Sequence, residues 1–342
     1  MNPRVFIRTD GNEKIGLGHV YRCLALSQML ATDFECCLVV RENPVLVSII
    51  QLHNISIRLI RADIPEDEEI QLLQEMIQQR SDILVLDGYQ FEASYQSVCK
   101  EAGIKVVVID DLCRDRFFAD MLINHGGELL RSRYEEKTQA KLLLGFDYLM
   151  LRQEFFSRQL TKSIDSEVGV AFICFGGADP FRVTTKAIRA AFWSGFIQRV
   201  IVVAGAAYQD WDSLNELKAD LKEKLEVHKA ATAEQMVKLI AGAQLAICPA
   251  SSISLEVCSV GTGLLTGTVI DNQNAIHLQL LGKGCAVSAG DLREIDEDQL
   301  ASCIRDIFER NLIESMKKKQ LEVVDGLSGH RLVKEFQILS GS

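Results

Sequence analysis

The stretch VFIRTDGNEKIGLGHVYR, residues 5–22, decides the fold because it joins a strand pattern to a helix pattern through a glycine-containing turn. Its apolar, β-branched run ends at Asp10, and apolar residues at three- and four-residue spacing begin just after His19. The order strand, turn, helix is the repeating unit of an α/β domain. The same order opens again at VAFICFGG, residues 170–177, and this predicts a second domain of the same kind.

Short apolar runs alternate with helical patterns along both halves of the chain. We predict strands at residues 5–10, 35–41, 55–60, 83–87, 105–111, 121–125 and 141–145, and at residues 170–177, 199–205, 225–230, 245–250, 263–269 and 285–290. Helical spacing is clearest at residues 66–80 and 232–243. Nearly continuous apolar strands indicate parallel sheets that are buried on both faces. The predicted fold class is therefore α/β, with two doubly wound, Rossmann-like domains facing each other across a cleft.

The length of 342 residues is about twice that of a typical single domain. We expect an amino-terminal α/β domain at residues 1–160, which carries the glycine and histidine turn, and a carboxyl-terminal α/β domain at residues 168–325. The predicted linker between them is the stretch of low apolar content at residues 160–168. Residues 326–342 have a helical pattern, and this helix is expected to cross back to the first domain.

The charge balance and the absence of long apolar runs exclude several classes of protein. Asp and Glu number 47 and Lys and Arg number 37, which gives a net charge of −10. This balance argues against a nucleic-acid partner, whose phosphates need basic side chains. No apolar run approaches the roughly 18 residues that span a bilayer, and the amino-terminal sequence lacks the features of an export signal. We therefore expect a cytoplasmic protein without integral membrane association, as a monomer or a weak dimer.

Cysteine and histidine spacing predicts neither disulfides nor metal. The 10 cysteines lie mostly in apolar runs, and no two of them have C-x-x-C spacing. Because cysteine packs like a small hydrophobe, buried free thiols are expected. The 6 histidines form no i, i+4 pair and no H-E-x-x-H motif, so neither a metal site nor a cofactor is predicted.

His19 is the first candidate catalytic residue. Gly16 and Gly18 precede it and allow a ligand to approach the backbone closely. A histidine in the first turn of a helix, just beyond the carboxyl end of a strand, lies where open α/β sheets bind ligands and can accept a proton there. The alternative is a histidine that only packs or caps a tight turn.

Asp87 and Tyr89 follow the strand predicted at residues 83–87 and form the second candidate group. Asp87 could orient a water molecule or a ligand hydroxyl, and Tyr89 could donate a hydrogen bond into the cleft. The alternative is an Asx turn with a packed tyrosine. Asp110 and Asp111 follow the next strand, and because neighbours on a strand point to opposite faces, we expect one to be a cap and the other to face the cleft.

The first strand of the second half ends in another candidate loop. Gly176 and Gly177 would bring backbone N–H groups toward a ligand. Asp179 would cap the following helix, with Pro180 at its first helical position.

Two later strand ends carry further candidates. Ser251 and Ser252 stand at a predicted helix start, where hydroxyl and N–H groups can bind a diphosphate, unless Ser251 only caps the helix. Glu256, about one turn further on, could accept hydrogen bonds from two ribose hydroxyls. Asn272 and Gln273 follow the next strand, and Asn272 could hold a sugar ring across the cleft.

The segment RTDGNEKIGLGHVYRCLALS, residues 8–27, resembles the amino-terminal signature of a bacterial family of UDP-sugar hydrolases. The best-known member of that family acts in pseudaminic acid biosynthesis, and another branch is labelled as spore-coat polysaccharide biosynthesis proteins. The resemblance continues in order through DGYQF, INHG, GFDYLMLRQEF, FGGADP, PASSISLEV and DNQ, and so covers nearly the whole chain. It implies the GT-B fold of two facing α/β domains.

The resemblance also implies roles for particular residues. His19 matches the catalytic base, Tyr89 a tyrosine near the sugar, and Asn272 an asparagine of the cleft. With Asp87 added to this catalytic group, the residues expected to bind substrate or UDP are Arg8, Asp10, Gly16, Gly18, Arg22, Gly176, Gly177, Ser251, Ser252, Glu256 and Gln273. Gly11 and Asn12 stand where the pseudaminic acid enzyme has serines, and this leaves the identity of the sugar open.

The function implied is hydrolysis of a UDP-activated amino or deoxy sugar at its anomeric C–O bond, without metal. UDP and the free sugar would be released for nonulosonic acid or surface polysaccharide biosynthesis. The alternative is a GT-B glycosyltransferase that uses a UDP-sugar donor, but this acidic sequence lacks the basic and apolar patch with which that class docks on membranes. A nucleotide-sugar binding module without activity is a third hypothesis, which the histidine in the glycine turn disfavours.

Overall fold

The computed structural model describes residues 3–11, 17–51, 53, 55–156, 169–177, 179–205 and 207–341. The chain divides into two compact units, each described here by itself. Unit 1 comprises residues 1–153 together with residues 326–342, and unit 2 comprises residues 154–325. The linker predicted at residues 160–168 and the predicted ligand-binding Gly16 lie outside the described residues.

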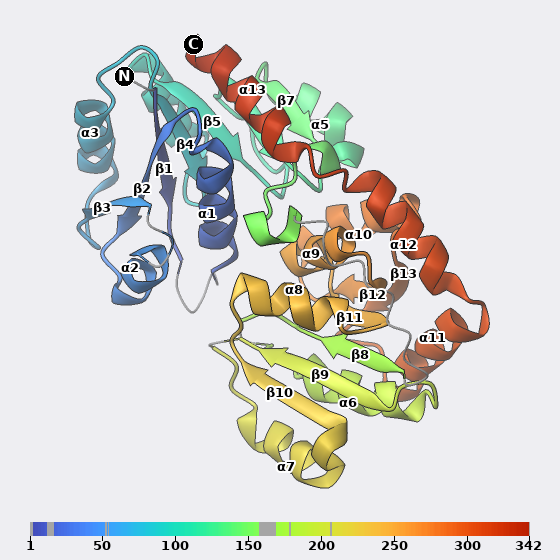
Figure 1. Ribbon diagram of the computed structural model, residues 1–342. Coiled ribbons are helices and arrows are strands. Elements are labelled where there is room, and N and C mark those ends of the chain that lie inside the picture. Colours follow the sequence, from blue (N-terminus) through green and yellow to red (C-terminus); the bar gives the residue numbers. More distant parts are fainter. Residues whose placement is uncertain are drawn as a thin grey trace. The chain divides into compact units, whose positions relative to one another are not determined.

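Unit 1 is built on a seven-stranded parallel sheet (Figure 1). Its strands are β1 (Arg4–Thr9), β2 (Glu35–Arg41), β3 (Ser56–Ile60), β4 (Ile83–Asp87), β5 (Lys105–Ile109), β6 (Met121–Asn124) and β7 (Lys141–Leu144). They lie in the order β3-β2-β1-β4-β5-β6-β7. Because β1 has β2 on one side and β4 on the other, the strand order reverses at β1, and this is where open α/β sheets bind ligands.

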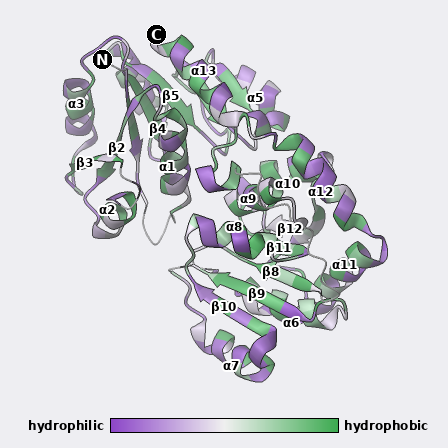
Figure 2. Cartoon of the chain, viewed as in Figure 1, coloured by the Kyte–Doolittle hydropathy of each residue, from purple (hydrophilic) through white to green (hydrophobic). Residues whose placement is uncertain are grey.

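Helices cover both faces of the unit 1 sheet. They are α1 (Gly18–Leu30), α2 (Pro44–Gln51), α3 (Glu66–Met76), α4 (Ala93–Glu101), α5 (Arg131–Glu135) and α13 (Ser328–Ser340). Val5 and Ile7 of β1 pack in one core with side chains of α1, α2 and α13, whereas Phe6 packs in the opposite core with α3 and α4. This alternation follows from the two-residue period of a strand. Apolar residues accordingly dominate the strands in Figure 2.

Unit 2 has a six-stranded parallel sheet in the order β10-β9-β8-β11-β12-β13. The strands are β8 (Val170–Ile173), β9 (Arg199–Ala204), β10 (Leu225–Lys229), β11 (Leu245–Pro249), β12 (Gly263–Thr268) and β13 (Val287–Asp291). The helices are α6 (Val183–Trp193), α7 (Trp211–Leu221), α8 (Ala233–Ala241), α9 (Ser252–Val260), α10 (Asn274–Gly282), α11 (Glu297–Glu309) and α12 (Leu312–Val323). Each strand predicted from the sequence has a counterpart, and the predicted α/β class with two doubly wound parallel sheets is confirmed.

Within the described residues, no helix is both long enough and apolar enough to cross a membrane. Helices α11 and α13 are amphipathic, with charged faces, as expected for helices that cover a sheet.

The carboxyl-terminal helix α13 is part of the core of unit 1, so its removal from that core should destabilise the unit. Phe336 is fully buried, and its ring lies edge-on to Phe34 with 6.1 Å between the ring centroids. We predict that Phe336→Ala lowers the free energy of unfolding by about 3–5 kcal/mol, because the change leaves a cavity. Urea unfolding followed by circular dichroism measures this loss.

The matched control for this prediction is Ile338→Ala on the same helix, where the side chain is 60% exposed. It should change the free energy of unfolding by less than about 0.5 kcal/mol. Equal effects of the two substitutions would contradict the placement of α13 in the core.

Candidate functional site

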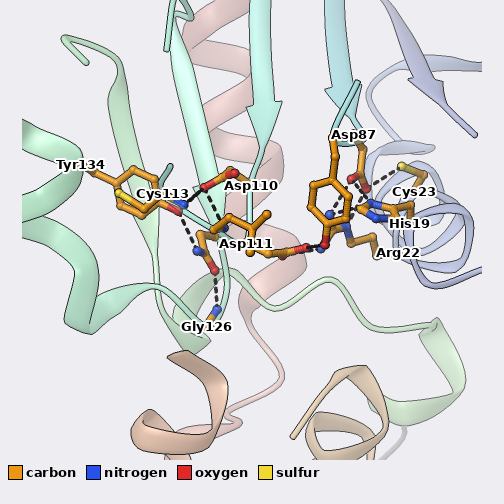
Figure 3. A network of polar contacts seen from close by, with 12 residues as sticks. His19, Arg22, Cys23, Asp87, Asp110, Asp111, Cys113, Gly126 and Tyr134 are labelled. Carbon is orange, nitrogen blue, oxygen red and sulfur yellow. Dashed lines mark hydrogen bonds and ion pairs between the residues drawn. The ribbon is translucent and has the colours of Figure 1, made fainter. Parts of the chain in front are cut away.

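The carboxylate of Asp87 is the centre of a buried polar cluster in unit 1 (Figure 3). Asp87 ends β4, and α1 carries its three partners at positions 19, 22 and 23, which helical geometry places on one face. His19 Nδ1 lies 2.7 Å from Asp87 Oδ1, and Arg22 donates to both carboxylate oxygens at 2.5 and 2.6 Å. The thiol of Cys23 donates to Oδ2 at 3.2 Å. The cluster therefore ties the first helix to the central strand next to it.

These contacts assign the ring hydrogen of His19. A carboxylate only accepts hydrogen bonds, so Nδ1 carries the hydrogen and donates it to Asp87. Arg22 Nη2 also lies 3.0 Å from Nδ1, but it is itself a donor and directs its hydrogen to the Asp87 carboxylate. The neutral ring therefore has its lone pair on Nε2, where a proton can be accepted.

Arg22 bridges two carboxylates. Besides Asp87 it donates from Nη1 to Asp111 Oδ1 at 2.6 Å. Burial by itself would raise the pKa of Asp87, but the charge and hydrogen bonds of Arg22 and His19 hold it well below its usual range. For Asp111 too, burial would raise the pKa, and the charge of Arg22 lowers it on balance. Both carboxylates are therefore ionised at neutral pH.

Tyr89 lies at the open side of this cluster. Its ring meets the His19 ring edge-on with 4.9 Å between the centroids, and its hydroxyl donates to Asp111 Oδ2 at 3.4 Å. A cavity of about 170 Å³ lies beside His19, and its lining includes Tyr89, Phe91, Gln96, Arg116 and Phe117. The alternative hypothesis, that Tyr89 is a packed tyrosine, is wrong because 45% of the residue is exposed.

Arg8 and Asp10, predicted as substrate-binding residues, form an ion pair within a buried network of unit 1. Arg8 is fully buried and donates to Glu69 at 2.7 Å, and its ion pair with Asp10 is also 2.7 Å long. Asp10 accepts from the backbone N–H of Arg41 at 2.9 Å and from Gln90 at 3.3 Å. The guanidinium of Arg8 is enclosed by these partners, and its contact with substrate stays a prediction.

Asp110 is the capping member of the aspartate pair. Its Oδ2 accepts from the backbone N–H groups of Leu112 and Cys113 at 3.1 and 2.7 Å, and from the Tyr134 hydroxyl at 2.6 Å. Burial raises the pKa of Asp110. The expectation that one aspartate of the pair caps a loop is confirmed, and the other, Asp111, faces Arg22.

His125 belongs to the same edge of the sheet, and sequence reasoning missed it. It follows β6, is 3% exposed, and its Nδ1 has no hydrogen-bond partner among the described residues. Burial, with a smaller contribution from the charge of Arg22, lowers the pKa of His125 to about 4. Two signals in the sequence pointed to it: its place at the end of an apolar strand and its position in the INHG motif.

In unit 2 the first candidate loop follows β8. Gly176 has a φ of +78°, and a side chain at either Gly176 or Gly177 would meet nothing within 4 Å. The Asp179 carboxylate accepts from the N–H groups of Val183 and Thr184 at 2.9 and 2.7 Å, so Asp179 occupies the start of α6. Because α6 begins at Val183, the placement of Pro180 at the first helical position is wrong.

The start of α9 differs from a capped helix. Ser251 has extended backbone angles and its side chain makes no capping hydrogen bond, while its carbonyl accepts from the N–H and hydroxyl of Ser254 at 2.9 and 2.6 Å. The capping alternative for Ser251 is therefore wrong. Glu256 lies one turn beyond Ser252 on the same helix and is 9% exposed.

The last two candidates follow β12. Asn272 and Gln273 lie in the 3₁₀ helix η6 (Asp271–Gln273), and Asn272 is partly buried. The Gln273 side-chain oxygen accepts from the backbone N–H of Val269 at 2.8 Å, which closes the turn after the strand. That oxygen therefore supports the loop, and the ligand-binding role of Gln273 stays a prediction.

The cysteines of the described residues are free, and most of them are buried. Within that part of the chain, no group of three or more His, Cys, Asp or Glu side chains is placed to hold a metal ion.

Several solved structures have the same fold, and glycosyltransferases are among them. MurG from Acinetobacter baumannii has a TM-score of 0.69 at 14% identity, with 98% of this chain and 99% of that chain covered. A UDP-glucosyltransferase from Polygonum tinctorium has a TM-score of 0.70 at 13% identity, with 100% and 99% covered. HepE from Anabaena, in complex with UDP and glucose, has a TM-score of 0.65 at 11% identity over 100% of both chains. The fold is thus the GT-B fold of glycosyltransferases.

Three curated proteins are similar in sequence, and no model of a known protein family matches the chain. The UDP-2,4-diacetamido-2,4,6-trideoxy-β-L-altropyranose hydrolase of Campylobacter jejuni is 23% identical over 287 residues, 83% of this chain and 98% of that protein. The spore coat polysaccharide biosynthesis protein SpsG of Bacillus subtilis is 23% identical over 329 residues, 94% of each. An uncharacterized protein of Methanocaldococcus jannaschii is 24% identical over 269 residues, 75% of this chain; the chain spans about half of that protein, 54% of its length.

The buried neutral His125 predicts a pH-dependent stability. Because its folded pKa of about 4 is below the ordinary value of 6.5, the unfolded chain binds a proton in this window and the folded chain does not. Its contribution is fully present above pH 6.5 and should be lost as the pH falls to about 4, by roughly 3 kcal/mol in total.

Urea unfolding at pH 7 and at pH 4.5 measures this slope. His125→Gln keeps a polar side chain that does not titrate, so the variant should lose less stability between the two pH values than the wild type. The exposed His330→Gln serves as the control and should keep the wild-type slope. An unchanged slope in His125→Gln would contradict the assignment.

Proposed function

We propose that this chain hydrolyses a UDP-activated amino or deoxy sugar at its anomeric C–O bond and releases UDP and the free sugar. The observation that carries the proposal is the contact between His19 Nδ1 and Asp87, which leaves Nε2 as a proton acceptor beside a cavity. The similarity to the Campylobacter jejuni hydrolase, over 98% of that protein, supports a reaction on a UDP-sugar.

The proposed step has water as its nucleophile. The water oxygen attacks the anomeric carbon, its proton passes to Nε2 of His19, and the bond to UDP breaks with its electron pair on the departing phosphate oxygen. Asp87 holds the His19 ring in the required tautomer and stabilises the imidazolium that forms, as a carboxylate does in other catalytic histidine pairs. Tyr89, against the ring edge, is the residue we assign to the sugar.

We assign the nucleotide to unit 2. The uncapped start of α9 at Ser251 and Ser252 offers backbone N–H groups to a diphosphate, and negative charge is favoured at that end of a helix. Glu256 on the same helix is assigned to the ribose hydroxyls, and the open backbone at Gly176 and Gly177 allows close approach of a ligand. Donors at the departing diphosphate are expected to supply much of the rate enhancement.

A glycosyltransferase is the second candidate, because glycosyltransferases are among the solved structures with this fold. The two functions differ in what receives the sugar. The protein should be incubated with a panel of UDP-sugars, with and without an alcohol acceptor, and UDP and free sugar measured. Release of both products without an acceptor supports hydrolysis, whereas UDP release that requires the acceptor contradicts it.

Replacement of His19 by Asn is expected to lower turnover by roughly 100-fold or more if His19 is the general base. Asn keeps an N–H donor for Asp87 and removes Nε2, so folding and UDP binding should be retained. The rate of UDP release and the calorimetric Kd for UDP are the measurements. The matched control is His330→Asn, an exposed histidine of the same unit, which should retain the wild-type rate. Normal turnover in His19→Asn would mean that the histidine only packs the turn.

Replacement of Glu256 by Ala is expected to weaken UDP binding while the fold is retained. Loss of charge-assisted hydrogen bonds to two ribose hydroxyls costs about 1.5–3 kcal/mol, which corresponds to a roughly 10- to 150-fold increase in Kd. Calorimetry with UDP measures the change, and Glu309→Ala at an exposed position of α11 is the control. An unchanged Kd in Glu256→Ala would refute the ribose role.

A further inference from the structure

The cluster around His19 contains more negative than positive charge. Among the described residues, Arg22 is the one arginine or lysine that contacts Asp87 and Asp111, at 2.5 and 2.6 Å, and both carboxylates are ionised. These three side chains together carry one negative charge. Burial of an unbalanced charge is costly, and it is therefore expected where a positive charge is to be stabilised.

The groups near His19 come from four elements and from the lining of the cavity beside it. That lining adds two acidic and two basic residues, whose charges balance: Glu92, Asp115, Arg114 and Arg116. On α1 they are Arg22 and Cys23, and the thiol of Cys23 stays protonated because burial raises its pKa well above the ordinary value. After β4 they are Asp87 and Tyr89, after β5 they are Asp110 and Asp111, and after β6 there is His125.

Most of these groups are already accounted for. Asp110 is turned toward its own loop and Tyr134, and His125 is neutral near pH 7. The charge of Asp87 is neutralised by Arg22, which donates to both of its carboxylate oxygens. Asp111 contacts the same guanidinium through one oxygen only, and its other oxygen has the distant Tyr89 hydroxyl at 3.4 Å. Its side chain is 16% exposed, whereas that of Asp87 is fully buried.

We propose that Asp111 is an electrostatic and positioning residue of the reaction: its unmatched negative charge, held in place by Arg22, favours the imidazolium form of His19 and the positive charge that develops on the sugar. The inference rests on the proposed function, because hydrolysis at an anomeric carbon passes through an oxocarbenium-like transition state. A fixed negative charge in a partly buried site stabilises that transition state, and the surrounding groups need not reorganise as it forms. Asp111 also receives the Tyr89 hydroxyl, so it orients the residue assigned to the sugar.

Asp111→Asn tests the charge because the two side chains have the same shape. The acid limb of the pH profile of kcat/KM should move to lower pH by about half a unit or more, since the imidazolium loses a nearby negative charge. The value of kcat/KM at neutral pH should fall by about tenfold or more, with Kd for UDP unchanged. Asp111→Glu restores the charge and should recover most of both effects.

The matched control is Asp110→Asn, the neighbouring buried carboxylate with the same substitution. It should lower the unfolding temperature through the loss of its loop contacts, and it should leave the acid limb in place. A movement of the acid limb in Asp110→Asn equal to that in Asp111→Asn would show a general structural effect and would overturn the proposal.

A second measurement does not depend on turnover. The imidazole resonances of His19, followed by NMR through a pH titration, should show protonation at lower pH in Asp111→Asn than in the wild type. Unchanged titration overturns the role of Asp111, and so does a changed titration with an unchanged kcat/KM. If the wild type releases UDP from no UDP-sugar, the proposed function fails and the catalytic role of Asp111 fails with it, while the titration still reports whether the charge acts on His19.

Discussion

The ion pair of Arg22 with Asp87 is the interaction on which the arrangement of side chains at the carboxyl-terminal edge of the unit 1 sheet depends. Asp87 is fully buried at the end of the central strand β4, and a buried carboxylate is stable only if it is paired and hydrogen-bonded. Arg22 meets this requirement with two nitrogen atoms and at the same time reaches Asp111. The first helix, β4 and the loop after β5 are thereby held in one geometry. The orientation of His19 follows from that geometry, since its Nδ1 shares the same carboxylate.

A second buried ion network lies at the end of β1, next to this cluster's strand β4. Arg8 is locked between Glu69 and Asp10, and the Tyr95 hydroxyl donates to Glu69 at 2.9 Å. Burial would raise the pKa of Glu69, but its contacts with Arg8 and Arg41 lower it on balance, so the network stays ionised. It connects β1 to α3 and fixes the point where the chain leaves the first strand. Residues that resemble ligand contacts in the sequence can therefore also serve the scaffold of the site.

The diphosphate site that we propose in unit 2 differs from the cluster in unit 1, because it relies on backbone groups at a helix start in place of charged side chains. Asp179 fills the start of α6 with its own carboxylate, whereas the start of α9 has no side-chain cap. The two helix starts are therefore not equivalent: a carboxylate caps the first, and no side chain caps the second. This difference explains how a chain with a net charge of −10 can be proposed to bind a diphosphate without a basic patch.

The sequence by itself determined the order of strands and helices, because strand and helix patterns are local and their periods of 2 and 3.6 residues are read directly. It also indicated the residues at the carboxyl ends of the strands, His19, Asp87 and Asp111 among them. Only the tertiary structure decided which charges are partners, since Arg22 meets Asp87 across 65 residues of sequence and Asp111 across 89. The same holds for Arg8, whose partner Glu69 lies 61 residues away on a helix that carries no motif. The physical reason is that a buried charge pairs with the side chains that lie next to it in space. Those neighbours depend on the order of the strands in the sheet, which is a property of the whole fold.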